Sequence, residues 1–305
     1  MVSLMKGILS PVVTPFNVDY SIDHERWTTH CQWLIDQDCG LAMFGTNSEG
    51  NSISVPEKQE ALDKLVAAGL PPERMMPGTG HCSISDTVTL SRHAVELGCG
   101  GVLMLPPFFY KGVSDEGIFR AIATIIDKIG DDRLRVYLYH IPPIAQVGFS
   151  LDLIDRLLTA YPNIVAGIKD SSNDWDNTKA MLERFPEWGG IFCGSEMTLA
   201  EAVRMGGAGC ISASCNINTA AIVNLYRNAN SDNADTLQES VNQVRTTAFK
   251  YPMIPALKAL VARATQNDEW MRVRPPLVEL TDEEKSGLYA DMDEIDFDMG
   301  YSTTQ

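Results

Sequence analysis

A single lysine follows an apolar stretch in the middle of the chain, and its position suits chemistry by a nucleophilic amine. The stretch Ile164-Val-Ala-Gly-Ile carries no polar side chain and runs directly into Lys169. A lysine in a partly dry site is poorly solvated as an ammonium ion, so the free amine becomes available to attack a ketone. The competing interpretation is a strand-end lysine whose stem is buried and whose charged head reaches water. Lys169 alone does not decide between the two.

A phenol and a polar loop follow two other apolar stretches. Tyr139 lies where a phenol can relay the protons that imine formation moves. The loop over 45–49 (GTNSE) offers hydroxyl groups and successive backbone N–H groups, which can bind a carboxylate. Each feature also has an ordinary structural explanation, a packed aromatic ring or a turn. Together, an amine, a phenol and an anion-binding loop are the parts that imine chemistry on a 2-keto acid requires.

Short apolar segments alternate with helical patterns up to about residue 229, which predicts parallel βα units. There are eight such segments, so we expect an α/β fold of the (β/α)8 TIM barrel type, with reacting groups at the carboxyl ends of the strands. The predicted strands are residues 7–13, 40–44, 74–78, 101–105, 134–140, 164–169, 190–193 and 209–213. Apolar residues at three- and four-residue spacing predict helices near 23–37, 56–68, 85–97, 114–129, 150–160, 174–185, 197–206 and 218–229. The spacing of Ser54 and Glu57 indicates a capping box at the start of the second helix.

The strand-like segments cease after residue 230. Three more helices are predicted there, over 231–249, 253–266 and 282–292. We therefore expect a barrel over residues 1–229, a C-terminal helical extension packed on it over 230–292, and a solvated acidic tail over 293–305.

The three strand ends resemble, in order and approximate spacing, those of the dihydrodipicolinate synthase / N-acetylneuraminate lyase family of class I aldolases. In that family the loop after the second strand typically reads GTTGE or GSTGE, the fifth strand ends in YNxP, and the sixth ends in G-x-K. The counterparts here are GTNSE at 45–49, YHIP at 139–142 and GIKD at 167–170. The resemblance covers essentially the whole chain, including Thr14-Pro15-Phe16.

The resemblance implies a Schiff-base-forming lyase or aldolase that acts on pyruvate or another 2-keto acid. Lys169 would form the imine and Tyr139 would relay protons. Thr46 and Asn47 would bind the pyruvate carboxylate, with Ser48 supplying a further donor nearby. The residues implied to line the pocket are Gly194, Ile211 and Ser212. A homo-oligomer, dimer or tetramer, is implied as well.

Departures from the family pattern bear on the second substrate. Synthases of the family carry an arginine soon after the YNxP tyrosine, and residues 143–145 (PIA) supply none, which counts against a role in lysine biosynthesis. A second tyrosine, which the synthases donate across a dimer interface, aligns with Phe109, so the relay is either rewired or uses the adjacent Tyr110. Sialate lyases carry an Asp-Glu pair where Ser195 and Glu196 stand here. The motifs GIKDSS at 167–172 and GSE at 194–196 are more similar to those of 4-hydroxy-2-oxoglutarate aldolases and of several uncharacterised relatives.

Rival functions find weaker support. A metal-dependent barrel enzyme needs clustered histidines and carboxylates, whereas the five histidines are scattered, so we expect neither a metal nor another cofactor. A phosphosugar isomerase needs a glycine-rich loop after its last strands, but the run over 206–209 (GGAG) precedes the last one. Two alternatives stay open: 4-hydroxy-tetrahydrodipicolinate synthase, and a barrel that binds a keto acid without turnover.

Composition narrows the possible partners. The net charge of −16 disfavours nucleic acid and anionic membranes, and no apolar run approaches the length of a membrane span. The seven cysteines are an odd number and show no CxxC spacing, which favours reduced thiols in a cytoplasmic protein. No signal peptide is recognised at the N-terminus. The expected partner is therefore a small 2-keto acid.

Overall fold

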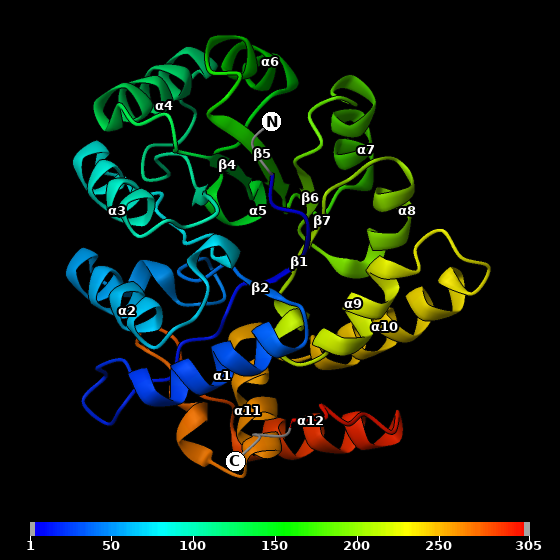
Figure 1. Ribbon diagram of the computed structural model, residues 1–305. Coiled ribbons are helices and arrows are strands. Elements are labelled where there is room, and N and C mark those ends of the chain that lie inside the picture. Colours follow the sequence, from blue (N-terminus) through cyan, green and yellow to red (C-terminus); the bar gives the residue numbers. More distant parts are fainter. Residues whose placement is uncertain (1–3, 302–305) are drawn as a thin grey trace.

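The computed structural model describes residues 4–301 and shows a curled, all-parallel sheet enclosed by helices (Figure 1). The sheet has the strand order β2-β1-β7-β6-β5-β4-β3, so neighbours in the chain are mostly neighbours in the sheet. Its seven strands are β1 (Gly7–Ser10), β2 (Gly40–Leu41), β3 (Val102–Met104), β4 (Val136–His140), β5 (Val165–Asp170), β6 (Ile191–Cys193) and β7 (Gly209–Ile211).

The gap between the two edge strands is filled by the segment over 75–79. Isolated parallel bridges join Leu41 to Met75 and Gly78 to Leu103, so this segment contacts both β2 and β3. The sequence analysis predicted a regular strand at 74–78. The structure differs because Pro77 has no N–H to donate to a ladder. With this eighth segment the curled sheet is consistent with the expected (β/α)8 barrel.

Helices follow the strands at the predicted places and surround the sheet. Their bounds are α1 (His24–Asp36), α2 (Val55–Ala67), α3 (Ile84–Glu96), α4 (Asp115–Ile129), α6 (Leu151–Ala160), α7 (Trp175–Arg184), α8 (Leu199–Arg204) and α9 (Thr219–Arg227). The capping box is confirmed, because the Ser54 side chain accepts the Glu57 N–H while the Glu57 carboxylate accepts the Ser54 N–H at 2.9 Å. One short helix, α5 (Pro142–Ala145), was not predicted.

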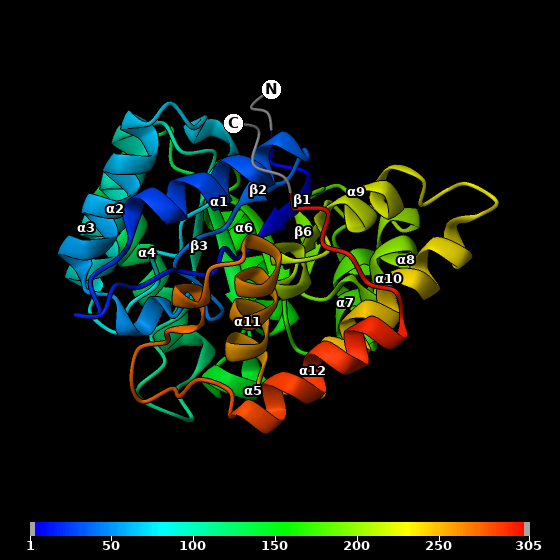
Figure 2. The same ribbon diagram turned by 90° about the horizontal axis from the view of Figure 1, so that it is seen from below.

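Three further helices follow the barrel and lie together on one side of it (Figure 2). They are α10 (Ala234–Ala248), α11 (Met253–Thr265) and α12 (Asp282–Glu294). Side chains of α11 form an apolar cluster that also includes Val13, Ala213 and Ile217 from the barrel. Within residues 4–301, no helix combines the length and the apolar character that a membrane-spanning segment requires.

The stretch after α12 returns toward the barrel, where the ring of Tyr301 packs against that of Trp33 at a tilt of 30°, with ring centroids 4.7 Å apart. This part of the segment that we expected to be solvated therefore contacts the protein. Residues 302–305 lie outside the described part of the chain.

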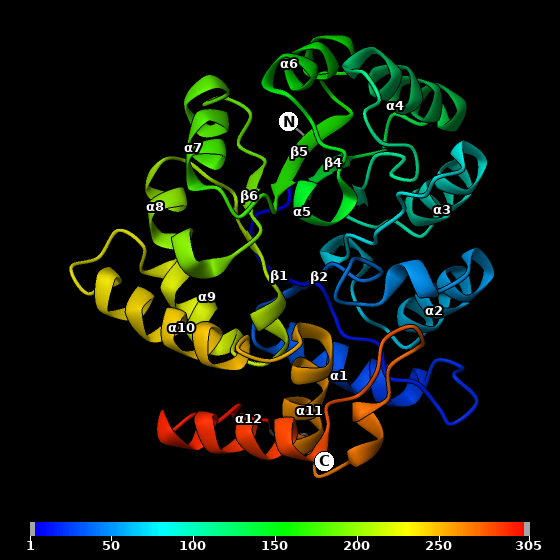
Figure 3. The ribbon, with the colours of Figure 1, turned by 180° about the vertical axis from the view of Figure 1, so that it is seen from behind.

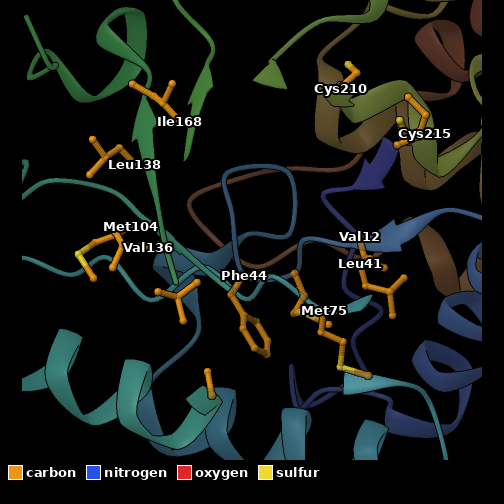
Figure 4. Packing of buried hydrophobic residues seen from close by; sticks show 14 of the residues in the cluster. Val12, Leu41, Phe44, Met75, Met104, Val136, Leu138, Ile168, Cys210 and Cys215 are labelled. Carbon is orange, nitrogen blue, oxygen red and sulfur yellow. The ribbon is translucent and has the colours of Figure 1, made fainter. Parts of the chain in front are cut away.

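Two apolar layers are separated by the strands. Residues such as Val136, Leu138 and Ile168 belong to the large cluster that includes the surrounding helices (Figure 4). Tyr137 and Tyr139 belong instead to a smaller cluster built mainly from strand residues, which fills the interior of the curled sheet. Since successive side chains of a strand point to opposite faces, this alternation places Tyr139 inside the barrel.

Candidate active site

Lys169 and Tyr139 are brought together by the pairing of β5 with β4. Their Cα atoms are direct partners in the parallel ladder, so both side chains point to the interior face. Lys169 Nζ donates a hydrogen bond to the Tyr139 hydroxyl at 3.4 Å and lies 4.4 Å from the centroid of its ring. Only 3% of Lys169 and 4% of Tyr139 is exposed. The snorkelling lysine that competed with the amine interpretation is therefore not what the structure shows.

The loop after β2 extends this hydrogen-bonded pair. Thr46 Oγ1 lies 3.2 Å from the Tyr139 hydroxyl, so amine, phenol and threonine hydroxyl form a continuous chain. A tight turn holds the loop in place, because the Gly50 N–H donates to the Gly45 carbonyl at 3.0 Å. A Cβ on Gly50 would lie 1.9 Å from the Phe44 carbonyl oxygen, so only glycine fits.

These groups open into a cavity of about 110 Å³. Its lining includes five of the residues predicted from the sequence: Thr46, Asn47, Tyr139, Lys169 and Gly194. A Cβ on Gly194 would lie 2.5 Å from the Asp170 carbonyl oxygen, so this wall of the cavity must be bare backbone. The remaining lining residues are Ile141, Pro143, Ile144, Ser171, Asn173, Ala213, Arg245 and Met253.

Three other predicted residues lie next to the cavity but do not line it. Ser48 is buried, and its carbonyl accepts a hydrogen bond from Thr14 Oγ1 at 2.8 Å. Ile211 is packed in the apolar interior of the barrel. The Ser212 hydroxyl donates to the buried Glu196 carboxylate. Two of them contact lining residues, because Ile211 shares its apolar cluster with Tyr139 and Ser212 Oγ accepts a hydrogen bond from Arg245.

Tyr110 lies apart from this group. It is 74% exposed in the segment between β3 and α4, and it does not line the Lys169 cavity. The adjacent Phe109 is 72% exposed and meets the Tyr110 ring edge-on at 5.4 Å. Within one chain, therefore, the structure does not bring Tyr110 to Lys169.

The sequence analysis missed Arg245, a cation that α10 contributes to the cavity. Its Nη1 donates to Glu196 Oε2 at 2.9 Å and to Ser212 Oγ at 3.0 Å. The signal was present in the sequence, because Arg245 stands four residues after Val241 and three before Ala248, which are both buried. A charged residue in the middle of the apolar face of a helix indicates a specific partner.

A buried ion pair fastens the polar loop to the helices beyond the barrel. Lys258 of α11 donates to the Glu49 carboxylate, and neither side chain is exposed. Lys258 also donates to the Arg272 carbonyl at 2.7 Å, while Glu49 Oε2 accepts the Arg274 N–H at 2.7 Å. Burial lowers the pKa of Lys258 to about 8, although Glu49 partly opposes the shift.

Beside the cavity, β4 and β5 end in a histidine and an aspartate. His140 Nδ1 accepts the Phe149 N–H at 2.9 Å, and burial lowers the pKa of His140 despite the neighbouring Asp170. Asp170 Oδ2 in turn accepts hydrogen bonds from Asn177 and Thr178. Among residues 4–301, no group of three or more His, Cys, Asp or Glu side chains is placed to hold a metal ion. The chemistry that this arrangement offers is that of an amine, a phenol and a hydroxyl.

Comparisons with known proteins agree with this geometry. The model of the dihydrodipicolinate synthetase family matches residues 4–295. The chain is 33% identical to an uncharacterised DapA-like lyase of Chloroflexus aurantiacus over 297 residues, which cover 95% of this chain and 97% of the relative. It is 25% identical to the 4-hydroxy-tetrahydrodipicolinate synthase of Bacillus subtilis, with 95% and 99% covered.

Solved structures give the same result. The crystal structure of a dihydrodipicolinate synthase from Agrobacterium tumefaciens superposes with a TM-score of 0.88 at 32% identity, and the match covers 95% of this chain and 99% of that one. A doubly substituted variant of a 2-keto-3-deoxygluconate aldolase of Sulfolobus solfataricus reaches a TM-score of 0.85 at 22% identity, with 95% of this chain and 96% of that one covered. At that identity the second match supports the fold alone.

Proposed function

The chain belongs to the dihydrodipicolinate synthetase family, and from this premise we propose that it forms a Schiff base with pyruvate or a related 2-keto acid through Lys169. Members of the family are lyases and aldolases, so the protein is an enzyme of the class I aldolase type. The observation that carries the proposal is the contact between Lys169 Nζ and the Tyr139 hydroxyl at 3.4 Å, inside a cavity that also holds Thr46.

Substrate binding begins at the loop after β2. The backbone N–H groups and side chains of Thr46 and Asn47 bind the carboxylate of the keto acid, which directs its ketone at the Lys169 amine. The amine attacks the ketone carbon to give a carbinolamine. Tyr139 donates a proton to the departing hydroxyl group, and Thr46 passes protons to and from the phenol. Water leaves and a protonated imine remains.

The imine then acts as an electron sink for the carbon–carbon bond. In a 4-hydroxy-2-keto acid, the bond between C3 and C4 breaks, and its electron pair moves into the imine to form an enamine. The C4 hydroxyl loses its proton and becomes the carbonyl of the released aldehyde. Protonation of the enamine at C3 and addition of water then release pyruvate and the free amine. Condensation is the same sequence in reverse.

The proposal also covers the domain organisation, the assembly and the cellular location of the protein. We take residues 1–229 as the barrel, 230–292 as a helical extension that carries Arg245 to the cavity, and the assembly as a homo-oligomer. Because Phe109 and Tyr110 are exposed aromatic residues, we assign them to a contact in which Tyr110 completes the relay of a neighbouring copy. The unpaired state of all seven cysteines supports a cytoplasmic location.

The test is the loss of activity when the enzyme is treated with borohydride. Borohydride reduces an imine to a stable amine, so inactivation should require pyruvate and should not occur with lactate. Release of pyruvate from a panel of 4-hydroxy-2-keto acids then distinguishes an aldolase from a barrel that only binds. Inactivation that is independent of pyruvate, with no turnover of any panel member, would contradict the proposal.

A further inference from the structure

We propose that Arg245 binds a second carboxylate at the far end of the substrate, which makes the enzyme selective for dicarboxylic 4-hydroxy-2-keto acids. This inference rests on the proposed function, because it concerns the part of the same substrate that leaves as the aldehyde. Figure 3 shows α5 near the centre of the view, after β4, and α10 beside the barrel; Pro143 and Ile144 of α5 and Arg245 of α10 line the same cavity. The residues of α5 (PPIA) include no basic side chain, so the arginine of this cavity comes from α10.

The guanidinium of Arg245 is held in one orientation. Its Nη1 contacts Glu196 and Ser212, as described above, and lies 3.4 Å from Ser214 Oγ. The guanidinium carbon also stacks 4.8 Å from the centroid of the Phe249 ring. These four contacts restrict the Arg245 side chain to one rotamer, so binding a ligand costs little further conformational entropy.

The opposite edge of the guanidinium is free to bind a ligand. Within residues 4–301, neither Nη2 nor Nε of Arg245 makes a hydrogen bond, although the side chain is only 13% exposed and lines the cavity. These two nitrogens form the planar fork that matches the two oxygens of a carboxylate. The contacts with Glu196 and the serines all use the other terminal nitrogen.

The other polar groups of the cavity have partners in the proposed reaction. Among the described residues that line the cavity, Lys169 and Arg245 carry the basic side chains. The Lys169 nitrogen is bonded to the keto carbon as the protonated imine, and the first carboxylate binds at Thr46 and Asn47. The charge of Arg245 is already paired with Glu196, so what it adds for a second carboxylate is the hydrogen-bond donors of Nη2 and Nε.

An apolar groove next to the cavity defines the competing possibility. It is lined mainly by Pro252, Ile254, Pro276, Leu277 and Val278, and it shares Thr46, Asn47, Ile144 and Met253 with the cavity. A substrate with an apolar tail would lie in this groove and would leave the Arg245 fork without a partner. A preference for such a substrate therefore counts against the proposal.

The experiment compares 4-hydroxy-2-oxoglutarate with 4-hydroxy-2-oxopentanoate, which differ only in a terminal carboxylate or methyl group. We expect the wild-type enzyme to favour the dicarboxylate. The ratio of the two kcat/KM values should fall about 10- to 100-fold in Arg245→Gln, as expected for a lost hydrogen-bonded charge pair. Arg245→Lys keeps the charge but loses the fork, so its ratio should be intermediate. Arg204→Gln, whose arginine pairs with Asp235 of α10, is the control and should keep the ratio.

Two measurements distinguish misfolding of the Arg245→Gln variant from loss of binding to the second carboxylate. Arg245→Gln leaves Glu196 buried without its cation, so the same substitution is also made together with Glu196→Gln. In the wild-type enzyme, half-maximal borohydride trapping should need less 2-oxoglutarate than 2-oxopentanoate. Equal trapping of the two, an unchanged ratio in the Arg245 variants, or a preference for the methyl substrate would overturn the proposal. Failure of the wild-type enzyme to trap pyruvate would instead overturn the proposed function.

Discussion

Replacing Lys258 by methionine should lower the free energy of unfolding by about 3–5 kcal/mol, because the change breaks a fully buried ion pair. Methionine fills the space of the lysine stem without its charge. The Glu49 carboxylate would then keep only the Arg274 N–H as a partner, and the Arg272 carbonyl would lose its donor. With neither side chain exposed, water cannot replace the missing ammonium group.

The double variant Lys258→Met with Glu49→Gln separates the orphaned charge from the lost packing. Glutamine removes the buried carboxylate and should recover about 1–3 kcal/mol relative to Lys258→Met alone. Lys64→Met is the matched control, because Lys64 pairs with Glu60 one helical turn away at the surface. It should change stability by less than about 0.5 kcal/mol.

Urea unfolding followed by circular dichroism measures all of these variants. The same samples report on function, because Glu49 belongs to the loop that we propose binds the keto-acid carboxylate. Loosening that loop should raise KM for the keto acid more than it lowers kcat. A loss of less than about 1 kcal/mol in Lys258→Met would show that the pair is not sealed from water, and the reasoning would fail.

Three further predictions concern single side chains. Tyr139→Phe should slow formation of the trapped adduct by about 100-fold or more while the circular dichroism spectrum is unchanged; an unchanged rate would remove the phenol from the relay. Burial lowers the pKa of His30 to about 4, below the ordinary 6.5, so stability should be complete above pH 6.5 and fall by about 1.4 kcal/mol per pH unit toward pH 4. His30→Phe should flatten that slope in acid unfolding, and an identical slope would contradict the assignment. Gly194→Ala should abolish adduct formation, since its Cβ would meet the Asp170 carbonyl; full trapping would contradict the tight wall.

The fold was largely predictable because it depends on local patterns. Alternating apolar segments and helical spacing give the order of the elements, and the capping box identifies Ser54 as the N-cap of α2, whose start was predicted one residue late. The exception at Pro77 has a local cause as well, because proline cannot donate to a ladder. The predicted strands nevertheless extend beyond the observed ones at several ends, such as 7–13 against β1 (Gly7–Ser10), because apolar residues also line the turns that follow.

The part of the candidate site that lies on adjacent strands was predictable from the sequence. Lys169 and Tyr139 end adjacent strands, so their contact follows from parallel pairing once the barrel is assumed. Arg245 and the Glu49–Lys258 pair depend on how helices from the end of the chain pack against loops near its start. The paired residues are 209 positions apart, and no local pattern links a loop glutamate with a lysine at that distance. Such contacts follow from tertiary packing.

Peptide mapping of the borohydride-reduced enzyme tests the central claim most directly. After treatment with pyruvate and borohydride, mass spectrometry should find one modified residue, Lys169, and the modification should be absent from Lys169→Arg. Lys179→Arg, which changes an exposed lysine of α7, should be modified at Lys169 like the wild-type enzyme. A modification on another lysine, or one that persists in Lys169→Arg, would contradict the account.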